Sequence, residues 1–247
     1  MIIAGNWKAY VEDAQRAKRL AASVKRLTTE TKHELVIAPS MLHLGMLAFR
    51  NKSKVKFAAQ DVSLSTGGAA TGEISARMLS EMDIPYVIIG HSERRAMGET
   101  DAIISEKARH AHAHGVHPIL CVGEHERDAD AAYLGFVRAQ ISSVFEPLSQ
   151  KERLATVIAY EPVWAIGKTA TEAITQSDLT EMILYIRKVL GDFLPGKAPA
   201  RMPVLYGGSV EPENARALAS GTGIDGFLIG RASTDAKQFR DIVKALG

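Results

Sequence analysis

The chain has 247 residues, of which 46% are hydrophobic and 23% are charged, and this composition is typical of a globular protein. Thirty basic and 28 acidic residues leave a net charge of +2, which is too balanced to favour a nucleic-acid-binding or membrane-surface protein. The single cysteine, Cys121, excludes a disulfide within the chain. No signal-peptide pattern and no run of ~20 apolar residues occurs, so we expect a cytoplasmic protein.

Short apolar runs alternate with longer amphipathic segments along the chain. The apolar runs predict strands at Ile2–Gly5, Leu35–Ala38, Val55–Ala58, Tyr86–Ile89, His117–Val122, Thr156–Tyr160, Val204–Tyr206 and Gly226–Ile229. Helical periodicity predicts helices that include Ala14–Leu27, Ile103–His114, Ala129–Leu148, Asp178–Leu190, Pro212–Ala219 and Lys237–Leu246. Helix-start signals support this pattern: Ser40 as an N-cap, Ser177 before Asp178, and Pro212 in a first helical turn.

This alternation predicts a closed parallel (β/α)8 barrel that forms a single domain over residues 1–247, because no Pro/Gly/Ser-rich linker interrupts it. An open doubly wound sheet is the competing arrangement. It would require a G-x-G-x-x-G turn after the first strand, and Gly5–Asn6–Trp7–Lys8 does not match one. In a barrel the active site lies at the carboxyl ends of the strands, so the residues that follow the strands belong to one rim.

Polar residues follow several of these strands. Asn6 and Lys8 follow the first strand, His91 follows the fourth, and Glu161 follows the sixth. Pro162 biases Glu161 towards an extended conformation, and the small-residue loop after it resembles a lid. A carboxylate base beside a lid suits proton abstraction in a closed, dry pocket. Glycine-rich turns after the seventh and eighth strands present backbone N–H groups that suit a phosphate.

Other features have simpler explanations. An isolated Glu-Pro is most often an exposed carboxylate before a loop, so Glu161 depends on the other rim residues for its interpretation. The histidines His110, His112, His114 and His117 lack an evident acidic or cysteine ligand nearby, which disfavours a metal site. Cys121 is expected to be a buried structural thiol. Trp7 is expected to be a packing residue.

The chain resembles the triosephosphate isomerase family in motifs that occur in order over nearly its whole length. These motifs are Gly5–Asn6–Trp7–Lys8, Gln60–Asp61–Val62–Ser63, Thr71–Gly72–Glu73–Ile74–Ser75, Gly90–His91–Ser92–Glu93–Arg94–Arg95, Cys121–Val122–Gly123–Glu124, Tyr160 to Gly167, and Tyr206–Gly207–Gly208–Ser209–Val210. The resemblance implies interconversion of dihydroxyacetone phosphate and glyceraldehyde 3-phosphate through an enediolate, in glycolysis and gluconeogenesis, without a cofactor or a metal.

The resemblance also implies a role for each matching residue. Glu161 is expected to be the base and His91 a neutral electrophile, a pairing known for this family. Lys8 is expected to supply positive charge, Asn6 to orient the substrate and Lys8, and Glu93 to orient or neutralise Lys8 or an arginine. The substrate phosphate is expected to be held by backbone N–H groups of Gly167, Ser209, Gly230 and Arg231.

Three departures from the family pattern stand out. The lid is two residues shorter, because Gly167 runs directly into Lys168–Thr169–Ala170. Arg231 occupies the position where the family usually has a second glycine, and Ala9–Tyr10 replace a Met-Asn pair. The region after Lys8 receives a partner's loop in the family, so we expect a homodimer whose docking loop is Asp61–Glu73, with Thr71 near its tip.

Two other functions remain open. One is an isomerase of the same fold that acts on a longer or different sugar phosphate, which a shorter lid would permit. The other is a phosphosugar-binding relative without catalysis, since barrels host many functions. The set of Asn6, Lys8, His91 and Glu161 argues for an enzyme.

Overall fold

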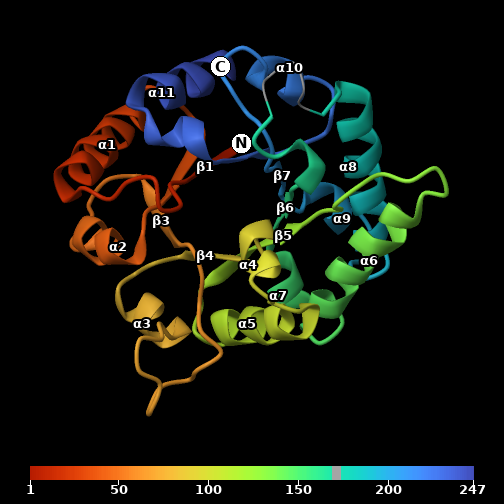
Figure 1. Ribbon diagram of the computed structural model, residues 1–247, viewed down its shortest axis with the longest axis horizontal. Coiled ribbons are helices and arrows are strands. Elements are labelled where there is room, and N and C mark those ends of the chain that lie inside the picture. The colour runs from red at the N-terminus through yellow and green to blue at the C-terminus, as the bar shows by residue number, and fades with distance from the viewer. Residues whose placement is uncertain (169–173) are drawn as a thin grey trace.

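The computed structural model describes residues 1–168 and 174–247, and it places a ring of helices around a closed barrel of parallel strands (Figure 1). Each strand pairs with the next in the sequence, and β8 closes the barrel by pairing with β1, with Ile3 opposite Phe227. The strands are β1 (Ile2–Asn6), β2 (Glu34–Ala38), β3 (Lys56–Ala59), β4 (Tyr86–Ile89), β5 (His117–Val122), β6 (Val157–Tyr160), β7 (Val204–Tyr206) and β8 (Gly226–Ile229). The predicted (β/α)8 fold is confirmed.

The strands are apolar throughout because both of their faces are covered. Side chains alternate between the barrel interior and the helix layer, as the period of two in a strand requires. The interior is filled by small and branched residues, namely Ala4, Val36, Ala38, Ala58, Ile88, Ile119, Cys121, Val157, Ala159, Leu205 and Leu228. The interior is therefore a packed core, and chemistry is possible only at its ends.

The helices pack their apolar faces on the outside of the barrel. They are α1 (Ala14–Leu27), α2 (Met41–Ala48), α3 (Ala76–Glu81), α4 (Ser92–Ala96), α5 (Asp101–Ala113), α6 (Ala132–Phe145), α7 (Gln150–Leu154), α8 (Gln176–Leu190), α9 (Ala198–Arg201), α10 (Ala215–Ala219) and α11 (Ala236–Ala245), with 3-10 helices η1 (Val163–Ala165) and η2 (Arg231–Thr234). In α1 the carboxylate of Asp13 caps the first turn by accepting the N–H of Arg16.

Several predicted elements match the structure at both ends, namely Ala14–Leu27, Tyr86–Ile89, His117–Val122, Val204–Tyr206 and Gly226–Ile229. The third strand was predicted one residue too early, because it runs from Lys56 to Ala59. The helix predicted from Ala129 begins only at Ala132. The carboxylate of Asp128 accepts the N–H groups of Ala132 and Tyr133, so the preceding residues form a capping turn.

The start signals of three helices were only partly right. Ser40 precedes α2, but its hydroxyl pairs with Nδ1 of His43 at 3.2 Å and caps no backbone N–H. Helix α8 begins two residues before Asp178 and is capped by the hydroxyl of Thr175. Pro212 lies outside α10, which begins at Ala215.

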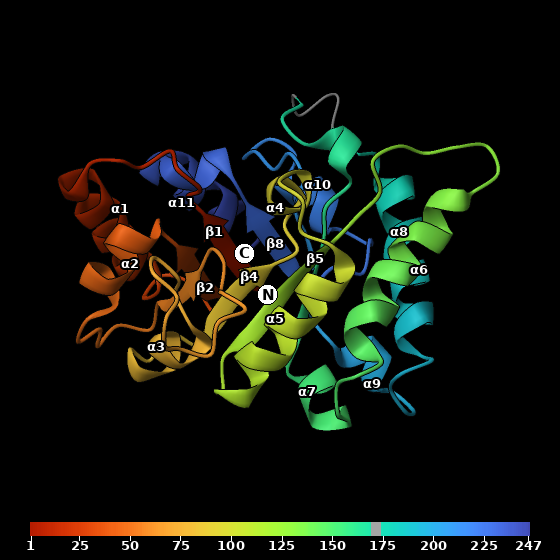
Figure 2. The ribbon, with the colours of Figure 1, turned by 60° about the horizontal axis from the view of Figure 1, so that its bottom comes forward.

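Short helices mark the two ends of the barrel (Figure 2). Helix α4 lies at the carboxyl ends of the strands, and α7 and α9 lie at the opposite end. None of these was predicted, because five residues or fewer carry too little periodicity to be recognised. Among the helices that the structure describes, none has the length and apolar character needed to cross a membrane.

Candidate active site

Strand periodicity places Glu161 on the inner side of the rim. Val157 and Ala159 of β6 point into the barrel, so Glu161, two residues further on, faces the same way. Its backbone N–H donates to the carbonyl of Val122 at 2.8 Å, which extends the strand pairing by one residue. The residue is only 4% exposed, so the carboxylate is buried at the mouth of the barrel.

Two glycines make room for this carboxylate. Because Val122 pairs with Tyr160 and Tyr160 with Tyr206, Gly123 and Gly207 lie at the level of Glu161 on either side. A Cβ on Gly123 would lie 1.8 Å from the backbone oxygen of Glu161, and one on Gly207 would lie 2.8 Å from its Cγ. Neither position can therefore take a side chain without moving the base.

His91 is aimed at this carboxylate by the start of α4. The residue is the N-cap of α4, and its Nδ1 accepts the N–H of Glu93 at 3.2 Å. In the neutral ring the proton therefore sits on Nε2, which lies 3.3 Å from Oε1 of Glu161. The N–H of Ser92 donates to Oε2 of the same carboxylate at 3.3 Å. One short helix thus positions both the imidazole and the carboxylate.

Lys8 is held in an unusual backbone conformation at the same rim. Its φ of 46° lies in the left-handed region, which a non-glycine residue adopts at a cost of roughly 1 kcal/mol or more. Oδ1 of Asn6 accepts its N–H at 3.0 Å, and the amide of Gln60 donates to its carbonyl at 2.9 Å. The ammonium lies 2.8 Å from Oε1 of Glu93. These contacts fix the ammonium at the mouth of the barrel.

The carboxylate of Glu93 forms an ion pair with Lys8. Burial raises the pKa of the Glu93 carboxyl, but the hydrogen bond and the charge of Lys8 outweigh it, so the pKa lies below its usual value. Glu93 therefore stays ionised.

The turns after β7 and β8 are the candidate phosphate site. The hydroxyl of Ser209 donates to the carbonyl of Ala165 at 3.1 Å, which joins the β7 turn to the start of the lid. The amide of Asn214 donates to the carbonyl of Ser209 at 3.0 Å and keeps this turn closed. Gly230 lies against Lys8, because a Cβ there would be 3.7 Å from Cε of Lys8. Ser209 and Gly230 therefore border the same mouth as the charged residues.

Arg231 begins η2 directly after Gly230, and its side chain is exposed. Burial raises the pKa of Glu211 in the neighbouring β7 turn, and the positive charge of Arg231 opposes that shift. The guanidinium therefore carries its charge next to the candidate phosphate site. Gly167 is also exposed and has a φ of 75°, a conformation that favours glycine. Thr169 and Ala170 of the lid lie outside the described residues.

The start of the lid is anchored by Glu124, which the sequence analysis did not single out beyond its motif. This carboxylate is 1% exposed and accepts hydrogen bonds from the hydroxyl of Tyr160 and from Nε1 of Trp164, both at 2.8 Å. Arg127 lies 3.3 Å from the same carboxylate oxygen, and its guanidinium stacks 5.5 Å from the ring of Trp164. The segment that follows Glu161 is therefore tied to the β5 turn.

A second cluster of charges holds α4 in place. The buried ammonium of Lys107 lies 2.6 Å from Asp61 and also contacts Glu99, and Arg94 of α4 contacts the same two carboxylates. Burial raises the pKa of Asp61, and Lys107 opposes this shift. The cluster supplies a rigid base for the helix that carries His91.

The remaining candidate groups have structural roles. Cys121 is buried, and burial, followed by the charge of Glu161, raises the pKa of its thiol well above the usual value, so the thiol stays protonated. Nε2 of His112 lies 2.9 Å from the hydroxyl of Thr156 at the other end of the barrel. Within residues 1–168 and 174–247, no group of three or more His, Cys, Asp or Glu side chains is placed to hold a metal. Trp7 is fully buried, as a packing residue should be.

The structure therefore brings Asn6, Lys8, His91 and Glu161 to one rim, with Ser209 and Gly230 at its edge. A buried carboxylate beside an imidazole N–H and an ammonium can move a proton next to a carbonyl and stabilise the charge that develops on oxygen. The positioning roles of Gln60, Gly123 and Glu124 were not predicted from the sequence. Each lies within a quoted motif, but its contacts join segments that are distant in the chain.

Comparisons with known proteins agree with this geometry. The family model described as triosephosphate isomerase matches residues 1–246. Proteins named triosephosphate isomerase from Moorella thermoacetica, Fusobacterium nucleatum and Thermus thermophilus are similar to this chain. The first is 40% identical, with 98% of this chain and 97% of the relative covered. The second is 39% identical, with 99% and 98% covered, and the third is also 39% identical, with 100% and 99% covered. The chain belongs to the triosephosphate isomerase family.

Proposed function

We propose that the protein is a triose-phosphate isomerase, which interconverts dihydroxyacetone phosphate and glyceraldehyde 3-phosphate through an enediolate. The observation that carries this proposal is the pairing of the buried Glu161 carboxylate with Nε2 of His91 at 3.3 Å, beside the ammonium of Lys8. Membership of the family supports the same reaction. The protein is then an aldose–ketose isomerase that acts with its own side chains.

In this proposal Glu161 removes a proton from the carbon next to the substrate carbonyl. The Nε2–H of His91 donates a hydrogen bond to the carbonyl oxygen, so the negative charge that forms on that oxygen meets a donor already in place. His91 passes a proton between the two substrate oxygens, and Glu161 returns a proton to the neighbouring carbon. Lys8 stabilises the charge on the enediolate, and Asn6 orients Lys8. No net proton is gained or lost in the cycle.

The phosphate is proposed to lie against the backbone N–H groups of Ser209, Gly230 and Arg231, with Gly167 added from the lid. These residues border the mouth that contains Lys8, which supports their assignment. Binding of the phosphate dianion contributes energy that can close the lid and exclude water. Exclusion of water matters because an enediolate phosphate that meets water loses its phosphate.

A coupled assay of glyceraldehyde 3-phosphate isomerisation tests the proposal. The wild type is expected to turn over the triose phosphate with a higher kcat/KM than an aldotetrose phosphate, and Glu161→Gln is expected to lower kcat by about 10²–10⁴-fold because the base is lost. A higher kcat/KM for the tetrose phosphate would reassign the substrate. Equal activity of wild type and Glu161→Gln would remove Glu161 from the chemistry.

We further propose that the protein is a cytoplasmic homodimer. Large apolar side chains are exposed in segments that follow β1, β3 and β4: Tyr10 lies after β1, Leu64 after β3, and Met97 after α4, which itself follows β4. Thr71 is exposed in the long loop that joins β3 to α3 and projects from the ring of helices (Figure 1). A partner loop that covers these side chains would remove them from water. Light scattering is expected to give twice the mass of the chain, and a fully active monomer would contradict the dimer.

A further inference from the structure

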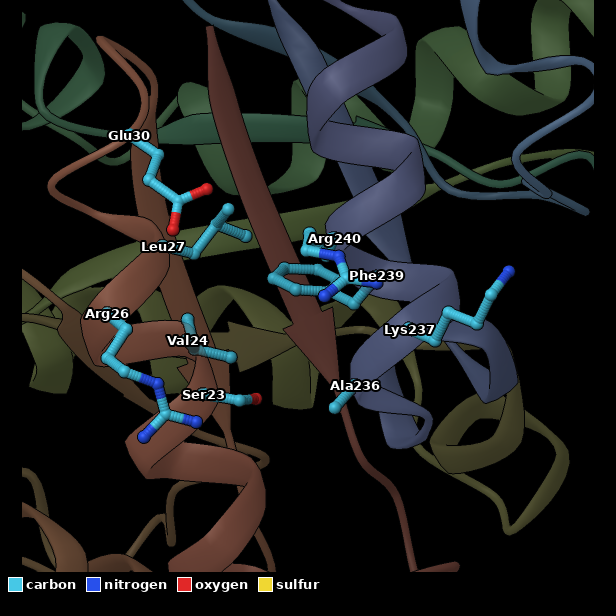
Figure 3. Close-up of a pocket in the computed structure, with 9 residues that line it drawn as sticks. All are labelled: Ser23, Val24, Arg26, Leu27, Glu30, Ala236, Lys237, Phe239 and Arg240. Atoms are coloured by element: carbon cyan, nitrogen blue, oxygen red, sulfur yellow. The ribbon is translucent and has the colours of Figure 1, made fainter.

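Helices α1 and α11 leave a groove between them on the outer surface of the barrel, away from the candidate active site. A cavity of about 310 Å³ lies in this groove, and a second hollow of about 520 Å³ adjoins it and shares Ser23, Arg26 and Ala236 (Figure 3). The floor of the cavity is apolar and buried, and includes Val24, Leu27 and Phe239. The charged side chains that line the cavity are Arg26, Glu30, Lys237 and Arg240.

The charges around this groove are mostly positive. Helix α1 carries five basic residues and no acidic residue in its sequence AQRAKRLAASVKRL. Arg16, Arg19 and Arg26 line the groove from α1, and Lys237 and Arg240 line it from α11. From Arg16 to Arg26 the helix rises ~15 Å, so the cations extend along the groove and are not gathered at one point. Such a concentration is unusual in a chain whose net charge is only +2.

Most of this positive charge is not neutralised within the part of the chain that the structure describes. Arg19 and Arg26 take part in no ion pair among residues 1–168 and 174–247. Arg16 donates its guanidinium N–H groups to the neutral carbonyls of Tyr10 and Thr234, both at 3.1 Å. Lys237 and Arg240 share a single carboxylate, that of Asp241.

The acidic residues at the groove do little to offset these cations. The carboxylate of Asp235 accepts the N–H groups of Lys237 and Gln238 and so caps α11. Glu30 lies 3.8 Å from Lys244, which partly neutralises it. Figure 3 shows Glu30 at one end of the cavity, with Arg26 and Arg240 on its two flanking helices.

We propose that this groove binds linked phosphates, such as the diphosphate of a nucleotide or inorganic pyrophosphate. A guanidinium group can donate two parallel hydrogen bonds to the oxygens of one phosphate. Cations on the two helices can therefore bind successive phosphates of one ligand. A single phosphate reaches fewer of them. The hydroxyl of Ser23 donates to the carbonyl of Leu20 at 2.8 Å, so the cations are the donors that the groove offers to a phosphate.

The groove also has a physical connection to the candidate active site. Arg16 holds the carbonyl of Thr234, the last residue of η2, and η2 begins with Arg231 of the candidate phosphate turn. It also holds the carbonyl of Tyr10, in the segment that follows Lys8. A ligand that draws Arg16 into the groove would loosen both segments. This link between the groove and the active site rests on the function proposed above, whereas binding in the groove does not. The link predicts that a ligand bound in the groove raises the KM for the triose phosphate.

Calorimetric titration of the full-length protein with inorganic pyrophosphate tests the binding. The titration is made with the candidate active site saturated with glycerol 3-phosphate, a phosphomonoester that cannot isomerise. We expect one pyrophosphate per chain, bound more tightly than inorganic phosphate. A parallel titration with ADP shows whether the groove also accepts a nucleoside. Failure of pyrophosphate to bind, or its complete displacement by glycerol 3-phosphate, overturns the proposal.

Two double variants distinguish a specific groove from diffuse positive charge. Arg26→Gln with Arg240→Gln removes one groove cation from each helix and is expected to weaken pyrophosphate binding by about tenfold or more. Lys18→Gln with Lys32→Gln removes the same charge from exposed positions that do not line the groove, and should leave binding within about twofold. Equal weakening in both variants overturns the site. If pyrophosphate binds tightly but the KM for the triose phosphate does not change, the link to the active site is overturned and the groove is a binding site alone.

Discussion

The two ends of the barrel use polar residues in different ways. At the carboxyl ends of the strands, Glu161, His91 and Lys8 are held by a few contacts each and face a common mouth. At the amino ends, the polar side chains join neighbouring elements to each other. Arg187 of α8 donates to the carbonyls of Pro199 and Gly223 and pairs with Asp225, each at 2.8 Å.

This difference agrees with the chemistry proposed for the carboxyl ends of the strands. The carboxylate of Asp225 also accepts the N–H of Val204, so its acceptor sites are used by β7 and α8 together. Lys8, in contrast, directs its ammonium to the common mouth, where it pairs with the exposed carboxylate of Glu93 at 2.8 Å. Residues at the amino end therefore contribute to stability, and residues at the carboxyl end contribute to activity.

After Glu161→Gln, the largest expected effect is the loss of activity in His91→Gln. This change removes the ring whose Nε2 faces Glu161, so the donor to the developing oxyanion is lost. We expect kcat to fall by about 10²–10³-fold while the free energy of unfolding changes little. His125→Gln, at an exposed histidine in the β5 turn, is the control and should keep full activity. A fall in stability that parallels the fall in kcat would count against the proposed division between the two ends.

Gly207→Ala tests whether the space around the base matters. The added methyl group would lie 2.8 Å from Cγ of Glu161, so the carboxylate must move. We expect a loss in kcat approaching ~10²-fold, since small misplacements of a reacting group are costly. Gly135→Ala in α6 is the matched control, because its Cβ would have no neighbour within 4 Å. Unchanged kcat in Gly207→Ala would show that the base tolerates displacement.

Arg187→Met tests the amino end. The change removes hydrogen bonds to two carbonyls and leaves Asp225 without its cation, so the free energy of unfolding should fall by about 2–3 kcal/mol. Urea denaturation measures this, and kcat should stay within about twofold of wild type. Arg216→Met, at an exposed arginine of α10, should change stability by less than ~0.5 kcal/mol. A large loss of kcat in Arg187→Met would contradict the view that residues at the amino end contribute to stability and not to activity.

The smallest expected effect is a change in the pH dependence of stability in His112→Gln. Burial lowers the pKa of His112 from 6.5 to about 4, with Glu152 opposing the shift and His117 adding to it. As the pH falls below 6.5, His112 becomes protonated in the unfolded chain before it does in the folded protein, which favours unfolding. The stability that neutral His112 contributes above pH 6.5 is therefore lost as the pH falls towards 4. The variant keeps a donor for Thr156 without titrating, so its stability should decline less between pH 7 and pH 5. Urea denaturation at pH 7 and pH 5 measures the two declines, with His125→Gln as the control. Identical declines in the wild type and in His112→Gln would exclude a contribution of His112 to the pH dependence of stability.

The barrel could be predicted from the sequence because the signals for its strands and long helices are local. A buried strand of four residues such as Tyr86–Ile89 is recognisable from its own composition, and the two-residue period then places Glu161 on the inner face. Short helices such as α4 were missed although α4 positions His91. Their formation depends on caps and packing that a few residues of sequence do not reveal.

The positioning contacts of the site could not be predicted because they join distant segments. Gln60 holds the carbonyl of Lys8 across 52 positions of the chain, and only the closed barrel brings β1 and β3 close enough for this contact. The sequence around Lys8 does not indicate its left-handed conformation, because glycine is the residue that usually adopts this backbone conformation. The packing of Gly123 and Gly207 around Glu161 likewise depends on strand register.

The central claim is that Glu161 moves a proton between two carbons of a triose phosphate. Isomerisation of glyceraldehyde 3-phosphate in D₂O, followed by NMR, tests it most directly. A carboxylate that holds the proton between two transfers can exchange it with solvent. The account therefore predicts deuterium bound to carbon in the products of the wild type, and no such label above background with Glu161→Gln. Rapid isomerisation by Glu161→Gln with deuterium bound to carbon, as in the wild type, would contradict the account.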